Sequence, residues 1–287
     1  MFKNKELSLA SPAVMGILNV TPDSFYDGGK YFSLTLGGRA GEGAFLLHAE
    51  KMIAEGADII DIGACSTRPN AKEVSEEEEL RRLIPAIKLV RNKFPDVIIS
   101  ADTFRSRVAE EAVNAGEDMI NDVSGGSVIA SEAKQSQSMF ETIAKLKVPY
   151  VLMHIQGTPQ TMQKNPQYKD VVKDVKEYFS FKVGKLKSFK VEQIILDVGF
   201  GFGKTVEHNY TLLKHLAEFK EFGLPILAGI SRKSMLNKAL GTKPEEALNG
   251  TTAANTIALM NGANILRVHD VKEAKEALKI FNFTQNL

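Results

Sequence analysis

The 287-residue sequence has little cysteine, no tryptophan and almost no net charge. Its single cysteine, Cys65, excludes a disulfide within the chain and a zinc site built from several cysteines. Its 36 lysines and arginines nearly balance 35 acidic residues, so no general attraction to nucleic acid or to an anionic membrane is expected. No apolar run has the length of a membrane span or of a signal-peptide core, and we expect a cytoplasmic protein.

Short apolar runs rich in isoleucine and valine recur along the chain. Runs of this kind predict strands that are covered on both faces, as in a parallel sheet. They lie at 14–20, 58–64, 97–103, 119–125, 150–155, 194–200, 225–231 and 265–270. Helical patterns lie between them, at roughly 41–56, 75–94, 105–115, 139–147, 168–188, 206–220, 245–261 and 271–281. Ser75 and Glu78 have the spacing of a capping box at the start of the second helix.

Eight strands that alternate with helices predict an α/β fold, a (β/α)8 TIM barrel. The structural alternative is a doubly wound open sheet, which usually has fewer strands. Segments 21–40 and 126–138 interrupt the regular spacing, and their small and polar residues predict surface loops, not linkers. We therefore expect one domain over residues 1–287.

Polar residues follow each predicted strand. In a barrel the carboxyl ends of the strands carry the functional loops, so these residues predict a site there. Helix capping explains some of them, but not the lysine and the arginines. The set is Asn19, Asp61, Asp102, Asn121, Asp122, His154, Asp197, Ser231, Arg232, Lys233, Arg267 and His269.

The glycine-rich stretch "DVGFGFGKT", residues 197–205, looks at first like a phosphate-binding loop. A P-loop needs a glycine five residues before Gly203, where this chain has Val198. The dinucleotide pattern fails as well, because Lys204 stands where its third glycine belongs. We expect Lys204 to be structural or at the rim of the site, and the glycines to let the backbone pass close to a ligand.

The strand-end residues suit three kinds of ligand group. The carboxylates and amide of Asp102, Asn121 and Asp197 suit a flat heterocycle with several N–H donors. The cations of Arg68, Lys233 and Arg267, with His269, suit an anion such as phosphate. Asn19, beside Asp23 and Asp27, offers oxygen ligands to Mg²⁺. Together they suggest a reaction that displaces a diphosphate leaving group.

These motifs resemble those of the dihydropteroate synthase family, in the family's order and over essentially the whole chain. They are "NVTPDSFYDGG" (19–29), "STRP" (66–69), "INDVSGG" (120–126), "GFGFGK" (199–204), "GISRKS" (229–234) and "RVHD" (267–270). The resemblance implies a transferase of folate biosynthesis that joins 4-aminobenzoate to (7,8-dihydropterin-6-yl)methyl diphosphate. The products are 7,8-dihydropteroate and diphosphate, and the family implies a homodimer.

The resemblance also implies roles for single residues at the pterin. Asp197 and Asn121 hold the pyrimidine edge of the pterin, and Asp102 lies on its other ring. Lys233 reaches the pterin carbonyl, and Arg267 stacks on the pterin.

Further roles concern the leaving group and the second substrate. His269, with Arg267, faces the diphosphate, and Asn19 is the expected Mg²⁺ ligand. The aminobenzoate side and its closing loop comprise Thr67, Arg68, Pro69, Phe202 and Ser234. The implied catalytic set is Asp102, Lys233, Arg267 and His269.

The expected mechanism is SN1-like. Loss of diphosphate leaves positive charge on the exocyclic carbon of the pterin, which Asp102 stabilises electrostatically. Loop closure excludes water, so the cation is not hydrolysed. No covalent enzyme intermediate is expected.

The sequence departs from the family pattern at three positions. Cys65 replaces the usual glutamate, and we expect a packing residue there and not a nucleophile. Asn70 replaces a glycine and Val198 replaces a proline. Three alternatives remain: a pterin-binding methyltransferase that serves a corrinoid protein, a non-catalytic pterin-binding paralogue, and a phosphosugar barrel.

Overall fold

The computed structural model of the chain describes residues 9, 11–20, 39–66, 74–126, 138–158 and 161–285. Its strands form one closed parallel barrel in the order of the sequence. They are β1 (Ala13–Asn19), β2 (Ile59–Gly63), β3 (Ile98–Asp102), β4 (Met119–Asp122), β5 (Tyr150–Met153), β6 (Ile194–Asp197), β7 (Ile226–Ala228) and β8 (Ile265–Val268). The barrel closes where β1 pairs with β8, with Met15 opposite Arg267. The predicted barrel is confirmed, and the open sheet is excluded.

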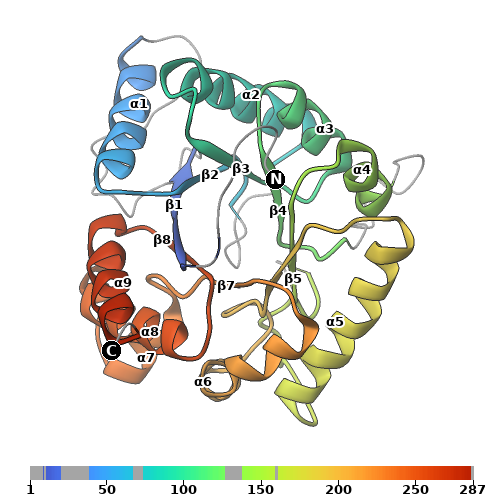
Figure 1. The fold of residues 1–287 in the computed structure, drawn as a ribbon, viewed down its shortest axis with the longest axis vertical. Coiled ribbons are helices and arrows are strands. Elements are labelled where there is room, and N and C mark those ends of the chain that lie inside the picture. Colours follow the sequence, from blue (N-terminus) through green and yellow to red (C-terminus); the bar gives the residue numbers. More distant parts are fainter. Residues whose placement is uncertain are drawn as a thin grey trace.

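Helices form the outer ring around these strands (Figure 1). They are α1 (Arg39–Ala54), α2 (Glu76–Lys93), α3 (Ser106–Asn114), α4 (Met139–Leu146), α5 (Val171–Ser188), α6 (Val206–Lys214), α7 (Ser234–Leu240), α8 (Leu248–Met260) and α9 (Val271–Gln285), with short 3-10 helices at Leu216–Phe222 and Pro244–Glu246. The periodicity predicted one helix, at 245–261, between β7 and β8. The structure has two, because the short α7 precedes α8.

The start of α2 differs in part from the predicted capping box. The Ser75 hydroxyl accepts the backbone N–H of Glu78 at 3.3 Å, as expected for an N-cap. The Glu78 carboxylate, however, pairs with Arg81 and Arg82, one turn further into the helix.

Buried apolar side chains form two separate layers. The larger layer lies between the strands and the helices. A smaller one fills the floor of the barrel, and its members are Ala13, Met15, Ile59, Ile98, Met119, Val151, Ile195, Leu227 and Ile265. Side chains alternate across a strand, so residues two positions further along face the same interior. In five strands that second residue is polar: Asp61, Ser100, Asn121, Asp197 and Arg267. The barrel therefore has an apolar floor and a polar mouth.

Candidate active site

One hydrogen-bonded cluster around Arg267 and Asp61 links four strands at the mouth of the barrel. Arg267 on β8 donates from Nε to Asp61 Oδ2 on β2 at 2.6 Å, and from Nη2 to Asp102 Oδ2 on β3 at 2.7 Å. Asn121 on β4 donates from Nδ2 to the same Asp61 oxygen at 3.1 Å, and the Ser100 hydroxyl donates to Asp61 Oδ1 at 2.6 Å. The structure thus brings together Asp102, Asn121 and Arg267, as expected, around the fully buried Asp61.

Burial and charge oppose each other in this cluster. Burial raises the pKa of Asp102 to about 7, although the Arg267 guanidinium acts to lower it. Burial disfavours the charge of Arg267, but the carboxylates of Asp61 and Asp102 outweigh that effect and raise its pKa. The arginine therefore stays charged, while the charge of Asp102 depends on its neighbours.

A second group of charges lies around Gly229, next to the first. A methyl group at this glycine would lie 3.8 Å from Lys233 Nζ, 3.9 Å from Asp197 Oδ2 and 3.9 Å from Arg267 Cβ. The Lys233 ammonium donates to the carbonyl of Phe200 and lies 4.7 Å from the centre of the Phe202 ring. Burial lowers the pKa of Lys233 to about 8, against the attraction of Asp197. Asp197, Lys233 and Phe202, which are expected at the pterin and the aminobenzoate, thus share one corner.

Three further expected site residues, His269, Ser234 and Asn19, lie at or after the ends of β8, β7 and β1. His269 Nδ1 lies 3.1 Å from the Ser231 hydroxyl, which also accepts the His269 backbone N–H at 3.2 Å. Ser234 begins α7, directly after Lys233. Asn19 ends β1 beside Asp102: a methyl group at Gly63 would lie 3.3 Å from the amide oxygen and 3.7 Å from Asp102 Oδ2.

Arg232 is structural, although it follows a strand end. It has a left-handed backbone, with φ of 55°. Its guanidinium pairs with both oxygens of Asp270, at 2.9 and 2.6 Å. This bidentate pair joins the loop after β7 to the loop after β8 and so fixes the positions of Lys233 and His269.

Lys204 anchors the glycine-rich loop, which is the structural one of the two roles expected for it. Its side chain is buried, and Nζ lies 2.9 Å from His154 Nδ1 and 3.0 Å from the carbonyls of Gly199 and Phe202. A Cβ at Gly199, which has φ of 70°, would lie 1.9 Å from the His154 carbonyl oxygen. Gly199 therefore lets the loop pack on the end of β5, and the expected approach of the loop backbone to a ligand stays a prediction.

Several expected residues fall outside the described part of the chain. They are Thr67, Arg68, Pro69 and Asn70, together with Asp23 and Asp27. Among the described residues, no group of three or more histidine, cysteine or acidic side chains is placed to hold a metal ion. In the same residues, no helix is long and apolar enough to cross a membrane.

Comparisons with known proteins agree on one family. The model of the pterin-binding enzyme family matches residues 15–269. Dihydropteroate synthase from Haemophilus influenzae is 47% identical over 99% of this chain and 98% of its own length. The Escherichia coli dihydropteroate synthase is 45% identical over 97% and 93%. The chain belongs to the dihydropteroate synthase family.

Solved structures of dihydropteroate synthases give the same result. The Yersinia pestis enzyme with a sulfonamide drug complex superposes with a TM-score of 0.90 at 42% identity, covering 100% of this chain and 99% of that one. The Xanthomonas albilineans enzyme in complex with 7,8-dihydropteroate has a TM-score of 0.84 at 36% identity, covering 100% and 98%. The fold and the family resemblance are therefore confirmed together.

Cys65, one of the three departures from the dihydropteroate synthase pattern, is partly buried in the structure. Burial, followed by the charge of Glu79, raises the pKa of the thiol far above its usual range. The sulfur lies 3.6 Å from Arg105 Nη1, and the same guanidinium pairs with Glu79 and donates to the Val74 carbonyl. A thiol held protonated in this way is no nucleophile.

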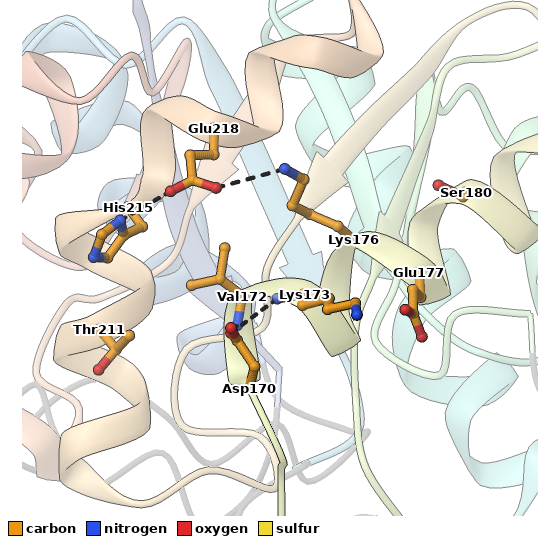
Figure 2. Close-up of a pocket in the computed structure, with 9 residues that line it drawn as sticks. All are labelled: Asp170, Val172, Lys173, Lys176, Glu177, Ser180, Thr211, His215 and Glu218. Atoms are coloured by element: carbon orange, nitrogen blue, oxygen red, sulfur yellow. Dashed lines mark hydrogen bonds and ion pairs between the residues drawn. The ribbon is translucent and has the colours of Figure 1, made fainter.

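A charged groove of about 450 Å³ lies on the outside of the barrel, between α5 and the segment from α6 to Glu218 (Figure 2). Several of its charged side chains pair with one another. Glu218 contacts His215 at 2.9 Å and Lys176 at 3.5 Å, and Asp170 caps α5. None of the residues of the dihydropteroate synthase motifs lines this groove.

Proposed function

We propose that the active site lies at the mouth of this barrel. There the amine of 4-aminobenzoate is joined to the exocyclic carbon of (7,8-dihydropterin-6-yl)methyl diphosphate. Dihydropteroate synthase activity follows from 45–47% identity to enzymes of that name over nearly the full chain. The observation that carries the proposed site is the convergence of Asp102, Asn121, Asp197, Lys233 and Arg267 in one polar mouth.

The pterin is proposed to lie with its donor-rich edge toward Asp197 and Asn121. One oxygen of Asp197 accepts the Gly199 backbone N–H at 2.8 Å, which fixes the carboxylate while its other oxygen lies toward the Gly229 corner. Two parallel N–H bonds to a carboxylate orient a planar ligand strongly. Lys233, at the same corner, suits the pterin carbonyl.

The diphosphate is proposed to lie toward Arg267 and His269. Asn19 is the proposed Mg²⁺ ligand, because its amide oxygen lies at the mouth and Mg²⁺ binds oxygen atoms. Mg²⁺ keeps several waters, so it needs few ligands from the protein. When bound, Mg²⁺ would neutralise charge on the leaving diphosphate. Arg267 binds the anion through guanidinium N–H groups, and His269 is held in place by Ser231.

We propose the following order of bond breaking and bond formation. The carbon–oxygen bond to the diphosphate breaks and the electron pair leaves with the oxygen, so the exocyclic carbon becomes cationic. Asp102 stabilises that charge. The neutral arylamine then donates its lone pair to carbon, and its proton is lost to the solvent. No group of the protein needs to act as a strong base.

The aminobenzoate is proposed to lie against Phe202, with its carboxylate near Ser234. Thr67, Arg68 and Pro69 are proposed to complete this side. We also propose a homodimer, because Leu240, Ile257 and Met260 on α7 and α8 are exposed apolar side chains. Sedimentation of the purified chain at the monomer mass would contradict the dimer.

Diphosphate release that depends on both 4-aminobenzoate and Mg²⁺ tests the reaction. We expect release by the wild-type chain and its loss in Asp197→Asn. Asp170→Asn, which removes a carboxylate that caps α5 outside the barrel, is the matched control and should stay active. Folded wild-type protein without release would contradict the function and leave the non-catalytic paralogue.

The dissociative order has its own test. Oxygen-18 placed in the bridge of the pterin diphosphate exchanges into non-bridging positions if the bond breaks reversibly before attack. We expect this exchange when an unreactive aminobenzoate analogue occupies the second site. Absence of exchange under those conditions would contradict an SN1-like reaction.

A further inference from the structure

Asp61 is the buried charge of the mouth to which the reaction above assigns no role. It lies on β2, one layer above the apolar floor, and its side chain has no solvent exposure. The expected site residues Asn121 and Arg267 both donate to one of its oxygens, at 3.1 and 2.6 Å. Burying an unpaired carboxylate costs on the order of several kcal/mol. Asp61 offsets this cost because it is paired with Arg267 and accepts further hydrogen bonds.

The partners of Asp61 distinguish it from the other buried aspartates. Asp122 accepts the backbone N–H groups of Ser124 and Gly126 and the Tyr150 hydroxyl, so it holds a loop. Asp118 accepts the Ile99 backbone N–H and pairs with Arg91. The described hydrogen bonds of Asp61, in contrast, all come from side chains. They come from three other strands, and two of the three donors belong to the proposed pterin site.

The geometry of the arginine gives Asp61 a specific task. Arg267 reaches Asp61 through Nε as well as Nη2, whereas Asp102 contacts Nη2. The Nε bond lies nearest to the root of the guanidinium and fixes its plane. A ligand group that competes for Nη2 can therefore displace Asp102 from the arginine while Asp61 keeps the guanidinium in place.

We propose that Asp61 is a positioning residue for the pterin half of the reaction, which holds Arg267 and Asn121 in one arrangement and does not touch the substrate. This inference rests on the proposed function, since it uses the proposed pterin site. Ser100 supports Asp61 from the next strand, by donating to its second oxygen at 2.6 Å. Lys233, Phe202 and Ser234 contribute no hydrogen bond to this cluster among the described contacts.

The test is steady-state kinetics of Asp61→Asn with each substrate varied in turn. Asparagine keeps the shape but presents an N–H₂ group to donors and removes the charge. We expect kcat/KM for the pterin diphosphate to fall about 30-fold, as for loss of a hydrogen bond to a charged group. The KM for 4-aminobenzoate should stay within about twofold of the wild-type value, because Phe202 and Ser234 are not held by Asp61.

Asp118→Asn is the matched control, because it makes the same change at another buried aspartate that is paired with an arginine. It should lower the unfolding midpoint and leave both kinetic constants unchanged. A normal kcat/KM for the pterin in Asp61→Asn would overturn the inference. The inference would also be overturned if the KM for 4-aminobenzoate changed as much as kcat/KM for the pterin diphosphate. The same fall of kcat/KM for the pterin diphosphate in Asp118→Asn would overturn it as well. An inactive wild type would instead contradict the proposed function.

Ser100→Ala tests the inference if Asp61→Asn does not fold. It keeps the carboxylate and removes one of its three donors, so we expect a severalfold fall in kcat/KM for the pterin diphosphate alone. Equilibrium binding of the pterin diphosphate without aminobenzoate should weaken by the same factor. Wild-type values in both measurements would overturn the inference.

Discussion

Lys204 makes the stability of this barrel depend on pH in a way that a single substitution removes. Its side chain is buried, with 4% of its surface exposed, and its ammonium group contacts His154 and the carbonyls of Gly199 and Phe202. Burial lowers the pKa of Lys204 from the ordinary 10.5 to about 7, against the attraction of Asp197. Between these two values the unfolded chain keeps a proton that the folded chain has released.

The sign and size follow from that difference. Because the unfolded state binds more protons, the free energy of unfolding rises with pH from about 7 to about 10. One proton contributes about 1.4 kcal/mol per pH unit, so Lys204 contributes about 2.5 kcal/mol between pH 7.5 and pH 9.5. The contribution is fully present above the unfolded pKa and is lost as pH falls through 7. The variant Lys204→Met lacks this pH-dependent contribution to the free energy of unfolding.

The assay is urea unfolding of the wild-type chain and Lys204→Met at pH 7.5, 8.5 and 9.5. The free energy of unfolding of the wild type, relative to that of Lys204→Met, should rise by about 2.5 kcal/mol over this range. Lys233, whose pKa burial also lowers, affects both proteins alike and cancels. Lys272→Met, at an exposed lysine of α9, is the control and should run parallel to the wild type. If Lys204→Met also runs parallel, the carbonyl acceptors keep the ammonium charged and the reasoning is refuted.

Three further perturbations have defined outcomes. Arg105→Met leaves Glu79 buried without its cation and should lower the free energy of unfolding by about 3–5 kcal/mol, whereas the double variant with Glu79→Leu should recover most of it in the same denaturant titration. Gly199→Ala places a Cβ 1.9 Å from a backbone carbonyl and should leave little folded, active protein on purification, while Gly184→Ala, with open space in α5, should raise stability by about 0.5–1 kcal/mol. Phe202→Leu removes the ring 4.7 Å from the site lysine and should raise the KM for 4-aminobenzoate about fivefold with little change for the pterin.

The barrel could be predicted from the sequence because each strand is short and begins with buried apolar residues. The run at 97–103, for example, contains β3 at Ile98–Asp102. Covered parallel strands need no alternation, so apolar runs separated by helical patterns suffice to indicate them. The short helix α7 did not show in the periodicity, because seven residues make only two turns. Its position followed from the family resemblance at Ser234.

Asp61 shows where prediction from the sequence stopped. Asp61 and Asp122 both lie at or near strand ends, and both are completely buried. Asp61 faces the barrel interior, whereas Asp122 bonds to Tyr150, which belongs to the layer under the helices. The sequence shows the alternation along a strand but not which phase faces inward. The register against the floor residue Ile59 is the signal that distinguishes them, and it needs the closed barrel.

The proposed pterin site also depends on the last strand in the sequence. Arg267 on β8 is separated by 206 residues from Asp61 and by 165 from Asp102, yet it bonds to both. Until β8 pairs with β1, these two carboxylates lack their cation, and a buried unpaired carboxylate opposes the closed state. Closure of the barrel and assembly of the proposed catalytic cluster are therefore one event. A substitution that weakens the pairing of β8 with β1 should lower activity and stability together, even where it touches no substrate.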